Sequence, residues 1–282
     1  MSPSDYLRRY RSLQVTLLDG ITIYNVDVHE YRNATTFYAG LDAEGDHNIH
    51  TGMTAKDKLM GKIRNRGTKV SAGNYQLRYS ASGEVLAKKD TTTSVAGTLI
   101  VNSVRILQPF QGKGSPEEIE MVLKLAVGCG LLTPTLDEMQ RYCNENIGLD
   151  CNGFVGNWVR AEGHGSLTPG THISTFSSTG TKRSAISEIQ ARDLMVFVSN
   201  SHIMAIDSLS ATTPNTTPNV ECLVAESCGS NVERGNIHTD GLNLTYYNVK
   251  SVNNKVFKVK RGRGWESASS QGTFNVYIVG VV

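Results

Sequence analysis

The segment GLDCNGFVGNW, residues 148–158, contains the strongest candidate for covalent chemistry in this sequence. A thiol attacks an acyl group as thiolate, and a helix N-terminus favours the thiolate through the positive end of the helix dipole. An apolar face follows at helical spacing: Phe154, Val155, Trp158 and Val159. This pattern predicts a helix that begins at or near Cys151. The unpaired N–H groups of such a helix start can bind an oxyanion, and Gly153 lets backbone or substrate approach closely.

A cysteine nucleophile needs a general base, and His202 is the best placed of the seven histidines. It follows the strand pattern DLMVFV and the turn SNS, and it starts the apolar run HIMAI. We expect Met204 and Ile206 to share its face and to anchor the strand behind it. A third polar group should hold the imidazole by its second nitrogen. The next strand, CLVAESC, offers Glu226, with Ser227 as the alternative.

The other four cysteines lack this context and are interpreted as structural: Cys129, Cys143, Cys222 and Cys228. The total of five is odd, and the sequence contains no C-x-x-C pair. These features argue against a zinc cage and against a dense disulfide framework.

The first 112 residues have mainly the pattern of β-structure. Two extended runs meet at Asp19-Gly20, which is a strong hairpin signal, and a similar arrangement surrounds Ser82-Gly83. The segment GTLIVNSVRIL, residues 97–107, predicts a further strand. Residues 54–67 predict a helix whose apolar stripe is Leu59, Met60 and Ile63.

The pattern changes near residue 112. Ser115 and Thr135 each stand three residues before a glutamate, which predicts two capped helices ahead of the one at Cys151. Strand patterns then continue to the end of the sequence. Helices followed by antiparallel strands predict an α+β fold with helices packed on an antiparallel sheet. We therefore expect a β-rich N-terminal domain over residues 1–112 and a catalytic domain over residues 113–282.

Three segments resemble the NlpC-type papain-like cysteine peptidases of bacterial cell walls: LDCNGFV, ARDLMVFVSNSHIMAI and LVAESCGSNV. In that family an Asp-Cys-Ser-Gly-Phe/Leu-Val motif opens the catalytic helix. A later strand starts with the catalytic histidine, and the strand after it carries a third polar residue. The resemblance covers residues 113–282. It implies a papain-like α+β catalytic domain with Cys151 as nucleophile and His202 as base.

The same resemblance implies roles for further residues. Asn152 stands where the family has Ser, and with Gly153 it would line the oxyanion or substrate site. Tyr142 would play the part of an upstream tyrosine that lines the oxyanion site. An ungapped alignment places Ala225 at the third position, so Glu226 takes that role only after a shift of one residue.

The resemblance implies a peptidoglycan hydrolase. It would cleave an amide bond in the stem peptide, of the γ-D-glutamyl–diaminopimelate type, through an acyl-thioester on Cys151. No metal or organic cofactor is required. Two alternatives use the same residues differently. One is a papain-like acyltransferase or deamidase toxin that acts on a protein or lipid, and the other is a non-enzymatic binding protein with a degenerate papain-like core.

Charge and hydropathy bear on partners and compartment. A net charge of +2 argues against nucleic acid as the main partner. The basic segment KVFKVKRGRGW, residues 255–265, is interpreted as a solvated strand face, with contact to an anionic polymer as the alternative. No run reaches the ~20 apolar residues of a membrane helix, and the N-terminus lacks the apolar core of a signal peptide.

We therefore expect synthesis in the cytoplasm and action in the periplasm or on the cell wall of a target bacterium. A secretion system that injects an antibacterial effector, or phage-tail machinery that carries a lysin, would deliver the protein. A cognate immunity protein would be a further partner.

Overall fold

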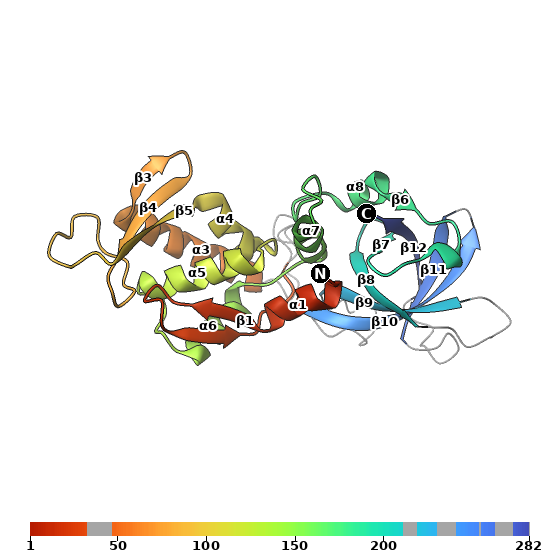
Figure 1. Cartoon of the computed structure of the whole chain (residues 1–282), viewed down its shortest axis with the longest axis horizontal. Helices are drawn as coiled ribbons and strands as arrows, with labels where there is room; N and C mark the ends of the chain where they lie inside the picture. Colours follow the sequence, from red (N-terminus) through yellow and green to blue (C-terminus); the bar gives the residue numbers. More distant parts are fainter. Residues whose placement is uncertain (33–46, 211–218, 230–240, 254, 263–272, 282) are drawn as a thin grey trace. The chain divides into compact units, whose positions relative to one another are not determined.

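The structure is a computed structural model, and it describes residues 1–32, 47–210, 219–229, 241–253, 255–262 and 273–281. The chain forms two compact units (Figure 1). Unit 1 comprises Met1–Arg8 and Asp150–Val282, and unit 2 comprises Arg9–Leu149. The expected boundary at residue 112 lies inside unit 2, because the helices that follow it pack on the strands that precede it.

Six strands of unit 1 close into an antiparallel barrel: β7 (Leu194–Phe197), β8 (Ile203–Ser210), β9 (Asn219–Cys228), β10 (Gly241–Asn253), β11 (Val256–Arg261) and β12 (Thr273–Gly280). Each strand pairs with the next, and β12 completes the ring by pairing with both β11 and β7. The short strand β6 (Thr181–Lys182) pairs with the end of β12.

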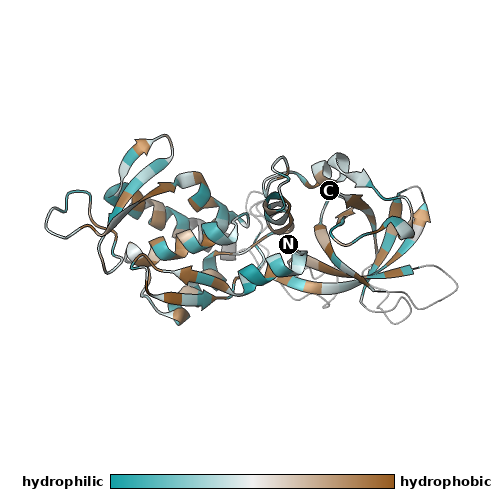
Figure 2. Cartoon of the chain, viewed as in Figure 1, coloured by the Kyte–Doolittle hydropathy of each residue, from teal (hydrophilic) through white to brown (hydrophobic). Residues whose placement is uncertain are grey.

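The expected papain-like α+β fold, with helices packed on an antiparallel sheet behind a β-rich N-terminal domain, is wrong. The core of unit 1 lies inside the closed barrel. Inward-pointing residues of its strands form one buried cluster: Met195, Phe197, Met204, Ile206, Cys222, Val224, Tyr247, Val249, Phe257, Val259, Val276 and Ile278. Hydrophobic and hydrophilic residues are mixed along β11, whereas β7 is hydrophobic at every position (Figure 2). An open sheet covered by helices contains strands of both kinds, so these patterns predict strands without predicting closure.

Helix α7 (Cys151–Ala161) lies outside the barrel against β8 and β9 (Figure 1). Its buried face contains the four apolar residues expected from the sequence. Gly156 allows the following loop to cross the helix closely, because a Cβ there would lie 2.5 Å from the carbonyl oxygen of Thr168. Between α7 and β7 the chain forms α8 (Ile173–Thr179), β6 and the short 3-10 helix η2 (Ile186–Glu188).

Unit 2 combines helices with two small sheets. The hairpin expected at Asp19-Gly20 is confirmed, with β1 (Leu13–Thr16) paired to β2 (Ile23–Val26). A three-stranded sheet contains β3 (Thr68–Ser71), β4 (Asn74–Tyr79) and β5 (Gly97–Asn102). The chain also reverses at Ser82-Gly83 as expected, but the returning segment makes only an isolated antiparallel bridge, from Val85 to Tyr79, and β4 pairs along its length with β5.

The helices of unit 2 follow local sequence signals closely. The predicted helix over residues 54–67 forms the second part of α3 (His47–Arg66), and its apolar stripe is buried. Helix α5 (Pro116–Gly128) has the capping box expected at Ser115, and Thr135 caps α6 (Leu136–Asn146). The strand expected to run through residue 107 is wrong beyond Asn102. There the Asn side chain caps α4 (Ser103–Leu107), which leads into the 3-10 helix η1 (Gln108–Gln111).

No helix within the described residues is both long and apolar enough to cross a membrane.

Candidate active site

Cys151 is the first residue of α7, at the helix N-terminus. The preceding residue, Asp150, is the N-cap, and its carboxylate accepts the Gly153 N–H at 2.6 Å. The Gly153 N–H is therefore occupied and cannot also bind an oxyanion. The first helical hydrogen bond runs from the Phe154 N–H to the Asp150 carbonyl. The N–H groups of Cys151 and Asn152 precede it and have no partner among the described residues, as is usual at a helix start.

The Asn152 side chain fixes this helix start to the loop that follows the helix. Its Nδ2 donates to the carbonyl oxygen of Thr171 at 3.0 Å. Its Oδ1 accepts the Cys151 thiol at 3.4 Å. Asn152 therefore orients the sulfur through its side chain, and only its backbone N–H is left for the oxyanion role expected from the sequence.

A tight turn after β7 places His202. Asn200 adopts φ 55°, a left-handed conformation in which Asn is enriched, and its N–H donates to the Phe197 carbonyl at 2.8 Å. The Phe197 N–H in turn donates to the His202 carbonyl at 3.0 Å. The Phe197 ring also packs edge-on against the imidazole, with centroids 5.3 Å apart. The turn and the aromatic contact together hold the buried imidazole at the start of β8.

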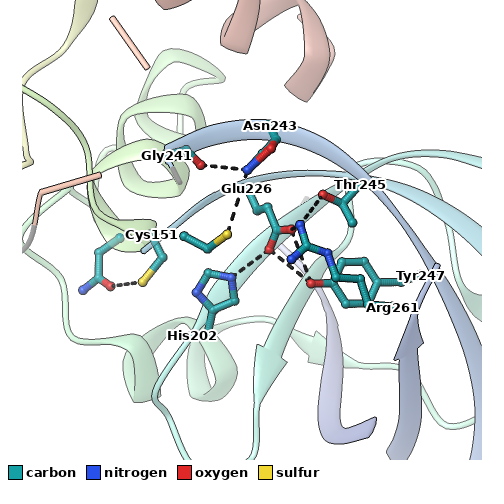
Figure 3. Close-up of polar contacts among 10 residues, drawn as sticks. Cys151, His202, Glu226, Gly241, Asn243, Thr245, Tyr247 and Arg261 are labelled. Carbon is teal, nitrogen blue, oxygen red and sulfur yellow. Dashed lines mark hydrogen bonds and ion pairs between the residues drawn. The ribbon is translucent and has the colours of Figure 1, made fainter. Parts of the chain in front are cut away.

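Glu226 lies on the inner face of β9, two residues beyond Val224 of the core cluster. It is fully buried, and its Oε2 lies 3.0 Å from Nε2 of His202. The other ring nitrogen, Nδ1, is left to face Cys151 (Figure 3). Ser227 is the next residue along the strand and so points to the opposite face. The structure therefore brings Cys151, His202 and Glu226 together within unit 1.

Three residues that the sequence analysis did not select hold the Glu226 carboxylate from inside the barrel. Nη2 of Arg261 lies 3.1 Å from Oε1 and also donates to Oγ1 of Thr245 at 2.9 Å. The Tyr247 hydroxyl lies 3.2 Å from Oε2 and 3.3 Å from Oε1. Figure 3 shows these groups on the side of Glu226 away from Cys151.

The expectation of a solvated strand face over residues 255–265 is wrong at Arg261. Lys258 is exposed as expected, but Arg261 is buried, because it follows the inward-pointing Phe257 and Val259 at a spacing of two. That alternation is visible in the sequence KVFKVKR and was a signal for an inward-pointing arginine. Arg263 lies outside the described residues.

Burial and charge act in opposite directions on His202. Burial alone would lower the pKa of the imidazole, but its contacts with Cys151 and Glu226 outweigh that effect and raise the pKa to about 9. Burial likewise works to raise the pKa of Glu226, and the hydrogen bond and charge of His202, together with the charge of Arg261, lower it below its ordinary range. An imidazolium beside a carboxylate is therefore the state that this site favours at neutral pH.

The thiols outside the site differ from Cys151 in accessibility. None of the five cysteines forms a disulfide, and Cys151 has the largest exposed fraction, 6%. Burial raises the pKa of Cys129 to about 11 and that of Cys222 to about 12, and it raises the pKa of Cys143 as well. These three thiols stay protonated at neutral pH and are poor nucleophiles.

Two further residues have contacts of their own, Tyr142 from the family resemblance and Asp193 at the entry to β7. Tyr142 lies on α6 in unit 2, outside the unit that contains Cys151, and its ring packs edge-on against Phe110. Its role at the oxyanion site stays a prediction. Asp193 precedes β7 and forms a two-point ion pair with Arg183, at 2.7 Å and 2.9 Å, so it fixes the strand entry.

Within the described ranges, no group of three or more His, Cys, Asp or Glu side chains is placed to hold a metal ion.

Comparison with protein-family models, with curated proteins and with solved structures finds no match to this chain.

Proposed function

We propose that this protein is a thiol-dependent amide hydrolase with Cys151 as nucleophile. One observation carries the proposal: the His202 imidazole lies between the thiol and a buried carboxylate, with Nε2 bound to Glu226. A nucleophile, a base and a group that orients the base are the three parts that acyl transfer through a side chain needs. The family resemblance of the three motif segments supports the same assignment.

The proposed reaction starts from a thiolate–imidazolium pair, in which the Cys151 sulfur has turned from Asn152 and its proton already lies on Nδ1 of His202. The sulfur then attacks the amide carbonyl, and the oxyanion is received by the N–H groups of Cys151 and Asn152. His202 returns the proton to the leaving amine, and an acyl-thioester remains. His202 then takes a proton from water, which attacks the thioester and releases the acid and the thiol. Glu226 stabilises the imidazolium in both halves of the reaction.

The proposed substrate is an amide bond in the stem peptide of peptidoglycan. This assignment rests on the resemblance to cell-wall peptidases and on the chemistry of the site. Delivery to the periplasm or wall of a target bacterium, and inhibition by a cognate immunity protein, belong to the same proposal.

The test combines purified peptidoglycan with the wild type, Cys151→Ala and Cys222→Ala. The last variant is a matched control, because it makes the same chemical change at a thiol in the barrel core. We expect the wild type and Cys222→Ala to release shortened stem peptides with new amino groups, detected by mass spectrometry of the muropeptides. We expect Cys151→Ala to release none.

Iodoacetamide labelling at pH 7, mapped by peptide mass, separates the two parts of the proposal. Preferential labelling of Cys151 with intact muropeptides would refute the substrate and leave the thiol chemistry standing. Labelling of Cys151 no faster than of Cys143 or Cys222 would refute the activated nucleophile itself.

A further inference from the structure

We infer that Arg261 is a positioning residue of this site, which holds the Glu226 carboxylate ionised and turned toward His202. The inference deepens the proposed thiol chemistry and rests on it. It adds β11 to the elements that position the three central residues, which are Cys151 at the start of α7, His202 just before β8 and Glu226 on β9.

The geometry of the barrel brings Arg261 to this position. Arg261 is paired across β11 and β10 with Tyr247, and both point inward. On the other side of β10, Asn243 is paired with Glu226 of β9. The guanidinium therefore reaches along the inside of the wall, over Thr245, to Oε1 of Glu226 at 3.1 Å. The second carboxylate oxygen is left for His202.

The contacts divide the carboxylate between two cations. Oε1 faces Arg261, and Oε2 faces His202, while the Tyr247 hydroxyl lies close to both oxygens. With both ends held, the carboxylate cannot rotate away from the imidazole without breaking an ion pair. Arg261 itself is anchored by Thr245, so its direction is set by a second contact on the neighbouring strand.

The buried negative charge of Glu226 requires a cation such as Arg261 beside it. Glu226 has no exposed surface, and a buried carboxylate is stable in its ionised form only when cations or donors surround it. The titratable groups that face it are His202 before β8, Tyr247 on β10 and Arg261 on β11. The charges of His202 and Arg261 both lower the pKa of Glu226. Of these two residue types, arginine is the one that remains protonated in proteins.

Arg261→Met tests the inference because it keeps most of the side-chain volume and removes the charge. We expect the pKa of Glu226 to rise, so that Glu226 protonates at a higher pH and His202 loses its partner there. The readout is the rate of Cys151 alkylation by iodoacetamide between pH 4.5 and 9, which needs no knowledge of the substrate. We expect the acid limb of this profile to move to higher pH by about one unit, which lowers the alkylation rate about tenfold at a fixed pH on that limb.

Three further variants complete the experiment. Arg261→Gln also removes the charge but keeps hydrogen-bonding groups, and we expect a shift in the same direction. Arg261→Lys keeps the charge and should restore most of the wild-type profile. Arg183→Met is the matched control, because it breaks another ion pair of unit 1, with Asp193, and should leave the profile unchanged.

A wild-type alkylation profile in folded Arg261→Met or Arg261→Gln overturns the inference. Loss of folding in both, with a wild-type profile in Arg261→Lys, would make Arg261 purely structural and would overturn it too. If wild-type Cys151 is not alkylated preferentially, the proposed function fails instead.

Discussion

At pH 6 the His202 imidazolium should stabilise the folded protein, and raising the pH to 10 should remove that contribution. The pKa of His202 is raised from the ordinary value of 6.5 to about 9. A raised pKa means that the folded state binds the proton more tightly than the unfolded chain. The contribution is therefore complete below about pH 6.5 and is lost as the pH rises through 9. At 1.36 kcal/mol for each pKa unit, it amounts to about 3 kcal/mol.

The assay is urea denaturation of the wild type and His202→Gln at a series of pH values from 6 to 10. We expect the difference in the free energy of unfolding between the two proteins to be largest at pH 6. It should narrow by about 3 kcal/mol by pH 10, where the wild-type imidazole is neutral. Cys151→Ala removes one of the two partners that raise this pKa, so its loss of stability should begin at lower pH.

The matched control is His164→Gln, which removes a histidine that follows α7 and has no contact with Glu226 among the described residues. Its stability should run parallel to that of the wild type over the whole range. A wild-type advantage over His202→Gln that stays constant, or that grows with pH, would refute the reasoning. Either result would show that His202 is not charged in the folded state near neutral pH.

Two further predictions concern the helix that carries Cys151. Asp150→Ala should lower the free energy of unfolding by about 1 kcal/mol, because the Gly153 N–H loses its cap, whereas Asp150→Asn should lose much less. Equal losses in the two variants, measured by urea denaturation, would contradict the capping role. Gly156→Ala should destabilise the protein by roughly 1–3 kcal/mol, because the new methyl would lie 2.5 Å from the Thr168 carbonyl. Gly165→Ala, where a Cβ meets nothing within 4 Å, is its control, and equal melting temperatures for the two variants would contradict the clash.

Helices with local capping signals could be predicted from the sequence. Ser115 and Glu118 form the expected capping box, and α7 begins at Cys151 as the spacing of its apolar face predicts. Such signals involve residues within one or two turns of each other. The chain needs no other part of the fold to satisfy them.

Barrel closure could not be predicted in this way. It depends on β12 pairing with β7, so that Val279 lies opposite Leu194. No local pattern distinguishes such a strand from the edge of an open sheet, because the inward-facing residues alternate in both cases. The fold class predicted from the order of helices and strands was therefore wrong, although the individual strands were found.

The candidate site likewise contains residues that could be predicted from the sequence and one whose role could not. Cys151 and His202 could be selected because each stands at the start of an element, next to a recognisable motif. The alternation in KVFKVKR places Arg261 on the same strand face as Phe257 and Val259, but it does not show which residue the guanidinium meets. Only barrel closure brings that face to a carboxylate 35 positions earlier in the chain.

The pairing of β12 also determines when the candidate active site can form during folding. Arg261 lies on β11, and β11 is held in the wall by β10 on one side and by β12 on the other. The barrel closes only when β12 pairs with β7, and contacts between strands so far apart in the chain form slowly, because a long loop must close first. Synthesis runs from the N-terminus, so Cys151 and His202 are made before the strands that complete the wall around Glu226. A nascent chain would carry the nucleophile without the finished site, and the proposed activity would appear only when the last strand has docked.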